Sequence, residues 1–303
     1  MLTMEAKRFT LHDFFRDFYT TAQCLEFLRK LRWPDGIHCQ TCDRITKHHL
    51  RIERKVYSCQ YCGTVVTPTK GTVLHKTKVP LPSWFWVVFQ MSKTRTGITA
   101  KQLERELGLT YKTVLRMCNL VRSALDEERD LSGQVEIDET YAGNSRRYMR
   151  GKRKRGRGTE KSPVFGMVER GGAVIAKVVP NCQRATVMPI IKAHVEEGSE
   201  VFTDEYVIYK TLEKEGYKHD TVNHGKKQYV KYREDGTKVH TNTMEGFWSY
   251  PKVATKGVHR GVSNRHLQGY FNEYTFRHSH RNDEEEMFFT MFRQIVPVER
   301  LAA

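Results

Sequence analysis

The sequence has no long apolar run and comparatively few acidic residues. Its strongest apolar run, residues 81–91, is too short to span a bilayer and is rich in aromatic side chains, so we expect a packed core element there. The first residues lack an apolar stretch followed by a cleavage site. We therefore expect a cytoplasmic protein with no membrane segment and no export signal.

The shortage of acids leaves a large positive charge. The 303 residues include 51 Lys and Arg against 35 Asp and Glu, which gives a formal net charge of +16. Such an excess resists compaction unless a polyanion offsets it, and phosphate backbones are the commonest such partner. The charge therefore favours a nucleic-acid-binding protein, although a generic basic surface would give the same count. A chain of this length can also hold more than one domain.

Four of the seven cysteines form two CxxC pairs, Cys39 with Cys42 and Cys59 with Cys62. Clustered cysteines in a cytosolic protein favour a metal over disulfides, and the gap between the pairs has the length of a zinc ribbon. Two such knuckles on adjacent hairpins give a closed tetrahedral site, so we predict a structural zinc that contributes to folding. The other three cysteines are isolated and are expected to pack as apolar residues: Cys24, Cys118 and Cys182.

Helical spacing of apolar residues occurs in 9–31, where Thr10 can act as a cap, and again in 98–117. In the second stretch Gly108 permits a tight turn and Thr110 caps a second helix, a helix-turn-helix pattern. Apolar residues of both helices would face inward. Three residues are left outward, where they could meet bases and phosphates: Tyr111, Lys112 and Arg116. Two packed helices that make no DNA contact would give the same pattern.

From residue 135 onward, short strands alternate with helices. A strand at 135–138 is followed by two β-rich runs, 163–169 and 173–179, whose Gly171-Gly172 junction indicates a hairpin. The order of elements is strand, strand, strand, helix, strand, helix, strand, helix, which is an α/β arrangement of the ribonuclease-H type. We expect four regions: an N-terminal helical segment (1–34), a zinc ribbon (35–75), a helix-turn-helix region (76–130) and a ribonuclease-H-like catalytic domain (131–303).

Two aspartates end apolar strands of this last region, Asp138 and Asp204. Carboxylates from adjacent strands can hold two divalent cations about 3.5–4 Å apart, which activate a nucleophile and stabilise a leaving oxygen. Mg²⁺ suits such a site, because it takes its remaining ligands from phosphate and water. Glu139 and Glu205 follow the aspartates and could be the ligands instead, but neighbours on a strand face opposite sides, and we favour the aspartates. Taken singly, each aspartate could also be a turn or cap residue.

A third carboxylate is expected from the helix that begins near Asn242. Glu245 is the candidate, although Asn242 as N-cap with Glu245 three residues on also fits a capping box. Lys252 lies two helical turns beyond Glu245 and on the same face, which would put a cation beside the metal site. Pro251 is expected to kink the helix there.

A basic run without acids covers residues 146–157, between the first aspartate and the hairpin. Like-charge blocks are usually solvated, but this position favours a DNA-clamping arm, with Arg153, Lys154 and Arg155 at its centre. A second basic set precedes the last acidic segment and could serve the same end: Lys226, Lys227, Lys231 and Arg233.

Taken in order, these motifs resemble the Merlin-type group of insertion-sequence DDE transposases. The resemblance covers nearly the whole chain and rests on the zinc ribbon and on residues 135–141, 203–205, 240–248 and 269–277. It implies a ribonuclease-H-like core, a two-metal mechanism with Mg²⁺ or Mn²⁺, and terminal inverted repeats as the DNA target. Asp138 and Asp204 would be the first two catalytic acids.

The same resemblance leaves the third acid open between Glu245 and Asn242, and it places Lys252 at the family's basic position. The function we predict is a transposase that nicks element ends and joins the freed 3′-hydroxyl to target DNA, working as a homo-oligomer on double-stranded DNA. Two alternatives stay open. One is a catalytically silent DNA-binding regulator, and the other is a structure-specific nuclease without a joining step.

Overall fold

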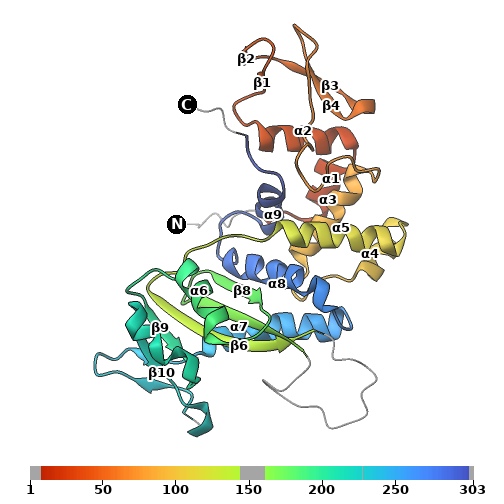
Figure 1. Ribbon diagram of the computed structural model, residues 1–303. Helices are drawn as coiled ribbons and strands as arrows, with labels where there is room; N and C mark the ends of the chain where they lie inside the picture. The colour runs from red at the N-terminus through yellow and green to blue at the C-terminus, as the bar shows by residue number, and fades with distance from the viewer. Residues whose placement is uncertain (1–7, 144–160, 227, 300–303) are drawn as a thin grey trace, which may run out of the picture. The chain divides into compact units, whose positions relative to one another are not determined.

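The computed structural model describes residues 8–143, 161–226 and 228–299 (Figure 1). The chain divides into two compact units: residues 1–125 with 283–303 form the first, and residues 126–282 form the second. In the described ranges no helix has both the length and the apolar character needed to cross a membrane. Residues 283–303 group with the first unit and not, as expected, with the catalytic domain over 131–303.

The first unit is mainly helical. Its helices are α1 (Leu11–Phe18), α2 (Thr21–Arg32), α3 (Leu81–Lys93), α4 (Ala100–Leu107), α5 (Tyr111–Ala124) and α9 (Met287–Ile295). The single helical stretch expected over 9–31 is two helices, because Thr10 and Thr20 each form a capping box and so begin a helix of their own.

Aromatic packing explains why the last helix belongs to this unit. Phe85 of α3 lies 4.3 Å from Phe292 of α9 and 5.0 Å from Phe18 of α1, measured between ring centroids. Aromatic pairs of this kind bury large apolar areas and add specific ring contacts. The segment after residue 282 therefore completes the core of the N-terminal helices.

Helices α4 and α5 have the boundaries expected from the sequence. Gly108 ends α4 in the left-handed region with φ of 65°, and the Thr110 side chain accepts a hydrogen bond from the backbone N–H of Thr113 at the start of α5. Leu103 and Val114 are buried between neighbouring elements. The three residues expected to face outward are all exposed: Tyr111, Lys112 and Arg116.

A small β-region of the first unit carries the CxxC pairs. Its strands are β1 (His38–Cys39), β2 (Arg44–Ile45), β3 (His48–Arg51), β4 (Val56–Cys59) and β5 (Val65–Val66), with a 3₁₀ turn η1 (Ile52–Arg54) between β3 and β4. β1 pairs antiparallel with β2, and β4 lies between β3 and β5. Gly63 follows the second pair with φ of 76°, a conformation that glycine adopts without strain.

The second unit is built on a five-stranded sheet with the order β10-β9-β6-β7-β8. Its strands are β6 (Gln134–Ala142), β7 (Ser162–Glu169), β8 (Val174–Val178), β9 (Glu200–Thr203) and β10 (Lys218–Thr221). β6, β7 and β8 pair antiparallel, whereas β9 is parallel to β6 and β10 is parallel to β9. The expected glycine hairpin joins β7 to β8, with Gly171 at φ of 79°.

The remaining elements of this unit are α6 (Arg184–His194), the 3₁₀ helix η3 (Val207–Glu215), the 3₁₀ turn η4 (His224–Lys226), the ribbon of β11 (Lys231–Tyr232) and β12 (Lys238–Val239), α7 (Asn242–Val253), the π-helical turn η5 (Ala254–Val258) and α8 (Asn264–Ser279). The order of strands and helices after residue 134 is the expected one, with a short ribbon added before α7. The segment after Tyr206, expected as a helix, is of the 3₁₀ type.

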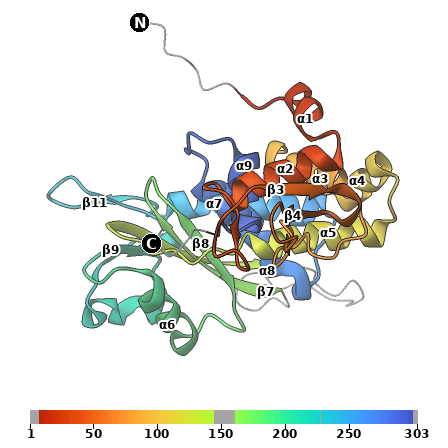
Figure 2. The same cartoon turned by 90° about the horizontal axis from the view of Figure 1, so that it is seen from above.

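Helices cover both faces of the sheet (Figure 2). Val135 and Ile137 of β6 belong to the core under α6 and η3, whereas α7 and α8 supply the core on the other face. Side chains alternate along a strand, so Glu136 and Asp138 point to the α7 face. Gly166 pairs with Asp138, and a Cβ at Gly166 would overlap Met244 and Trp248, so α7 packs directly on the sheet at this place.

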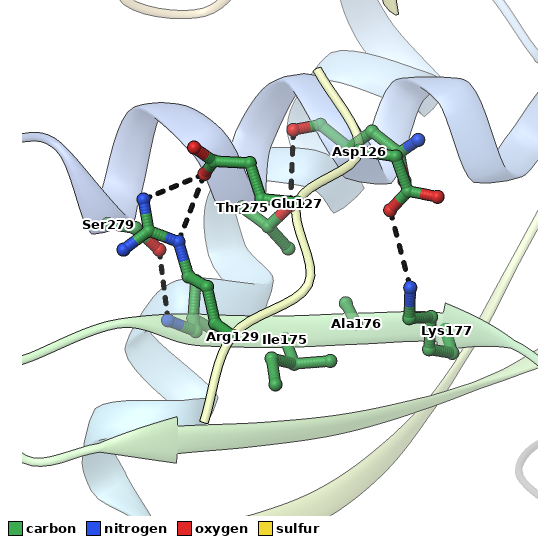
Figure 3. Close-up of a pocket in the computed structure, with 10 residues that line it drawn as sticks. Asp126, Glu127, Arg129, Ile175, Ala176, Lys177, Thr275 and Ser279 are labelled. Atoms are coloured by element: carbon green, nitrogen blue, oxygen red, sulfur yellow. Dashed lines mark hydrogen bonds and ion pairs between the residues drawn. The ribbon is translucent and has the colours of Figure 1, made fainter. Parts of the chain in front are cut away.

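The first residues of the second unit run beside the edge strand β8 and α8 (Figure 3). Lys177 of β8 lies 3.3 Å from Asp126, and Arg129 lies 2.8 Å from Glu127. These pairs line a shallow pocket whose charged groups are already engaged with one another. We therefore attribute a structural role to this pocket.

Candidate active site and metal centre

Asp138 and Asp204 come from neighbouring parallel strands. The register pairs Glu136 of β6 with Phe202 of β9, which puts Asp138 and Asp204 at the same level, two residues further along. The pKa of Asp138 is raised to about 6, first by burial and then by the negative charge of Asp204 and Glu245. Asp204 is held by the backbone N–H of Tyr206, which donates to its carboxylate at 2.9 Å.

Helix α7 brings the third carboxylate, that of Glu245, close to Asp138. The indole N–H of Trp248 donates to Asp138 at 3.0 Å, and Glu245 lies three residues earlier on the same helix face. The Glu245 side chain is 49% exposed and lies 3.7 Å from the Nδ1 atom of His224. Three carboxylates from three separate elements are therefore electrostatic neighbours.

Lys252 follows on the next turn of α7. Loss of hydration lowers its pKa, while the charges of Asp138 and Glu245 act in the opposite direction. Lys252 is therefore an electrostatic neighbour of Asp138 and Glu245. Pro251 lies inside the helix, which nevertheless continues to Val253 and passes into the π-helical turn η5.

The two glutamates next to the aspartates have other partners. Glu139 faces the α6 side of the sheet and accepts a hydrogen bond from the hydroxyl of Tyr209 at 2.9 Å. Glu205 accepts from the backbone N–H of His224 at 2.9 Å. The Glu139 contact follows the alternation along β6, whereas Glu205 lies beyond the end of β9 and is engaged by the backbone of His224. Both engagements favour the aspartates as the candidates.

The capping-box interpretation of Glu245 is wrong. The N-cap is Thr241, Asn242 is the first helical residue, and no cap side chain makes the hydrogen bond. A carboxylate from β6 takes that place, because Glu136 accepts from the backbone N–H groups of Thr243 at 2.8 Å and Met244 at 3.1 Å. Glu245 is therefore free of a capping role.

Sequence reasoning missed three residues that shape this site: Glu136, Arg170 and Trp248. Glu136 has no exposed surface and lies 2.7 Å from the Nε atom of Arg170. The signal in the sequence was a glutamate between the apolar residues Val135 and Ile137, two residues before Asp138 and so on the same face. A buried acid of this kind requires partners, but the sequence does not say which ones.

The four CxxC cysteines meet at one point. The Sγ atoms of Cys39 and Cys62 are 3.4 Å apart, those of Cys42 and Cys59 are 3.9 Å apart, and all four lie within 4.8 Å of one another. Backbone N–H groups and the Thr46 hydroxyl lower the pKa of Cys59, whereas the neighbouring sulfur atoms raise the pKa of Cys42, so the loss of a proton from one thiol opposes the loss from the next. Four sulfur ligands without an open position fit structural zinc.

Among the described residues, these cysteines are the one group of three or more potential ligands that gather this closely. The carboxylates of Asp138, Asp204 and Glu245 are thus more widely spaced than the thiols. A divalent cation with several water and phosphate ligands does not need a tighter protein cage. Such a cation would offset the negative charges of Asp138, Asp204 and Glu245.

The predicted DNA-contacting residues divide into three groups. Those of α5 are exposed, as described above. Arg153, Lys154 and Arg155 lie outside the described residues, as does Lys227. In the second basic set, Lys231 lies 2.7 Å from Asp220 and Arg233 lies 2.9 Å from Glu200, so acids of the same unit already balance these two charges.

Comparison with known proteins identifies the family. The ISXO2-like transposase domain matches residues 130–279, and the transposase zinc-ribbon domain matches residues 20–65. An uncharacterized protein in transposable element ISH50 of Halobacterium salinarum is 30% identical over 281 residues, which cover 86% of this chain and 92% of that protein. An uncharacterized transposase-like protein of Haemophilus influenzae is 28% identical over 123 residues, 41% of this chain and 93% of that protein. The chain therefore belongs to the ISXO2-like family of insertion-sequence DDE transposases and carries that family's zinc ribbon ahead of the transposase domain.

Proposed function

We propose that this chain binds the terminal inverted repeats of its element, cleaves DNA strands at the element ends and joins the freed 3′-hydroxyl to target DNA. The observation that carries the proposal is the approach of Asp204 and Glu245 to Asp138, whose pKa is raised to about 6 by burial and then by these two negative charges. Like charges held together in this way favour a bound cation.

The catalytic unit is proposed to have a ribonuclease-H-like fold. The order β10-β9-β6-β7-β8, with three antiparallel strands followed by two parallel ones, supports this assignment. In this arrangement the first acid lies on the central strand, the second follows the adjacent parallel strand, and the third comes from the helix after the last strand.

The acids are proposed to hold Mg²⁺ or Mn²⁺. When bound, two such ions supply an activated water or hydroxyl on one side of the phosphate and a stabilised leaving oxygen on the other. The indole N–H of Trp248 donates to one carboxylate oxygen of Asp138 and so orients this proposed ligand. Lys252 is proposed to contact a DNA phosphate near the acids, which is supported by the electrostatic influence of Asp138 and Glu245 on this residue.

DNA recognition is proposed for α4 and α5 as a helix-turn-helix. Tyr111, Lys112 and Arg116 are exposed on α5, where side chains can reach base edges and phosphates. We propose that the zinc ribbon binds a zinc ion whose role is structural. Because an element has two ends and each needs a catalytic site, we also propose a homo-oligomer on DNA.

A DNA assay on the wild-type protein distinguishes this function from its alternatives. The substrate is duplex DNA that ends in the element's inverted repeat, incubated with a target plasmid in Mg²⁺. A transposase gives both cleaved ends and joined products. Cleaved ends that never join would indicate a structure-specific nuclease, and binding without cleavage would indicate a silent regulator. Either of these two results would contradict the proposal.

A further inference from the structure

The buried carboxylate of Glu136 is surrounded by donors from the start of α7. Its oxygens accept from the backbone N–H and the hydroxyl of Thr243 at 2.8 Å and 2.9 Å, and from the backbone N–H of Met244 at 3.1 Å. His240 lies 3.1 Å away through its Nδ1 atom. Carboxylates at a helix N-terminus are stabilised by its unpaired N–H groups and its dipole.

Arg170 completes these contacts and extends them. From the turn after β7, its Nε atom lies 2.7 Å from Glu136, and its other nitrogens donate to the carbonyl oxygens of Lys238 at 2.7 Å and His240 at 3.1 Å. The guanidinium also lies over the Phe202 ring, 4.2 Å from its centroid. Arg170 thus ties the segment that precedes α7 to the sheet.

Helix α7 is consequently attached to the central strand at two points. Glu136 holds its first turn, and Asp138, two residues along the same face of β6, accepts from Trp248. Two attachments fix both the shift of a helix along its axis and its rotation. Glu245 lies between them on the helix, so its position relative to Asp138 follows from this attachment.

We propose that Glu136 and Arg170 form a positioning pair that sets α7 so that Glu245 completes the cation site. This inference rests on the proposed function, because it presumes that Glu245 is a ligand. Glu136 itself is not a ligand, since its oxygens are occupied and it has no exposed surface. Residues that orient metal ligands in this way act through the ligand, and their loss weakens metal binding.

The test is Glu136→Gln. The substitution keeps one oxygen for the N–H groups of Thr243 and Met244, but it presents an amide N–H₂ to Arg170, which can only donate. Mn²⁺ affinity is measured directly by titration calorimetry on the full chain, and DNA affinity and melting temperature are measured in parallel. We expect Mn²⁺ binding to weaken by about 10-fold or more, with DNA affinity essentially unchanged.

Arg233→Gln is the matched control. Arg233 also pairs with partly exposed acids of this sheet, Glu200 and Asp220, but it makes no hydrogen bond to α7 in the described structure. This control is expected to lower the melting temperature and leave Mn²⁺ affinity as in the wild type. A folded Glu136→Gln protein with wild-type Mn²⁺ affinity would overturn the inference.

Two further variants keep the outcome decisive. If Glu136→Gln does not fold, Thr243→Val removes a single hydroxyl donor to Glu136 and should weaken Mn²⁺ binding in the same direction but less; unchanged affinity there would also overturn the inference. Asp138→Asn tests the cation site itself. If that protein binds Mn²⁺ as the wild type does, the proposed function fails, whatever Glu136 does.

Discussion

Glu245 and Asn242 both lie in the first turn of α7, but their surroundings differ. The charge of Glu245 contributes to the raised pKa of Asp138, and its carboxylate lies 3.7 Å from His224. Asn242 is exposed, and its backbone N–H donates to His240 at 3.3 Å. The surroundings therefore favour Glu245 as the third ligand.

Substitution at these two positions separates the candidates. Glu245→Gln removes the charge without changing the shape and should lower the rate of DNA cleavage by about 100-fold or more, as expected when a preorganised charge is lost. Asn242→Ala should stay within a few-fold of the wild type. Rates are measured on inverted-repeat DNA in Mg²⁺, with melting temperatures to show that both variants fold. The reverse pattern would make Asn242 the ligand.

At the scale of single residues, the local pattern gave Asp138 and Asp204 as candidates but not their supporting residues. Asp138 does not end its strand as expected, because β6 continues through it to Ala142. Asp138 and Asp204 stand out because each follows apolar strand residues. The partners of Glu136 lie 107 and 108 residues away in the sequence, so no local spacing relates them. For the same reason the capping-box interpretation of Glu245 was wrong, because the carboxylate at the start of α7 is that of Glu136 from β6.

Among the elements, the cysteine ribbon has little apolar core of its own. Its strands are two to four residues long, and the four sulfur atoms lie at its centre. A unit of this kind depends on its metal for folding. The ribbon should therefore respond to the loss of a single ligand.

Cys59→Ser should lose the bound zinc and local order in residues 38–66, while the second unit keeps its fold. Zinc is measured by mass spectrometry of the native protein, and local order by amide hydrogen exchange. Cys182→Ser, a buried cysteine of the second unit, is the control and should retain one zinc per chain. Full zinc content in Cys59→Ser would rule out the four-cysteine site.

Most elements of the second unit could be predicted, because strand alternation and glycine turns are local features. Their order after residue 134 follows the sequence-based expectation, including the β7–β8 hairpin. The break between α1 and α2 was missed, because the apolar spacing continues through two capping boxes. The packing of α9 against α3 was missed, because the ring contact between Phe85 and Phe292 joins segments that are far apart in the sequence.

For the whole molecule, the net charge of +16 predicts DNA binding that depends strongly on salt. Replacing Arg153, Lys154 and Arg155 together by Gln should flatten the slope of log affinity against log salt. Each lost phosphate contact changes that slope by about 0.9, so three contacts would change it by about 2.7. Affinities are measured by fluorescence anisotropy over a range of salt concentrations.

The control is the double substitution Arg184→Gln and Lys192→Gln. Both of these residues pair with Glu215, so they release few counterions on binding DNA. Their loss should leave the salt slope as it is. If the triple variant also keeps the wild-type slope, the basic run does not contact DNA.

The central claim is that Asp138 and its neighbours hold the cations that cleave DNA, and a change of ligand chemistry tests it most directly. Asp138→Cys replaces a hard oxygen ligand by a sulfur ligand, which accepts Mn²⁺ more readily than Mg²⁺. Glu139→Cys is the matched control, because Glu139 faces Tyr209 on the other side of the sheet. Cleavage of inverted-repeat DNA is measured for both in each metal. The account predicts that Asp138→Cys is inactive in Mg²⁺ and partly active in Mn²⁺, while Glu139→Cys keeps the wild-type ratio. An Asp138→Cys protein that cleaves in Mg²⁺ at the native rate would contradict it.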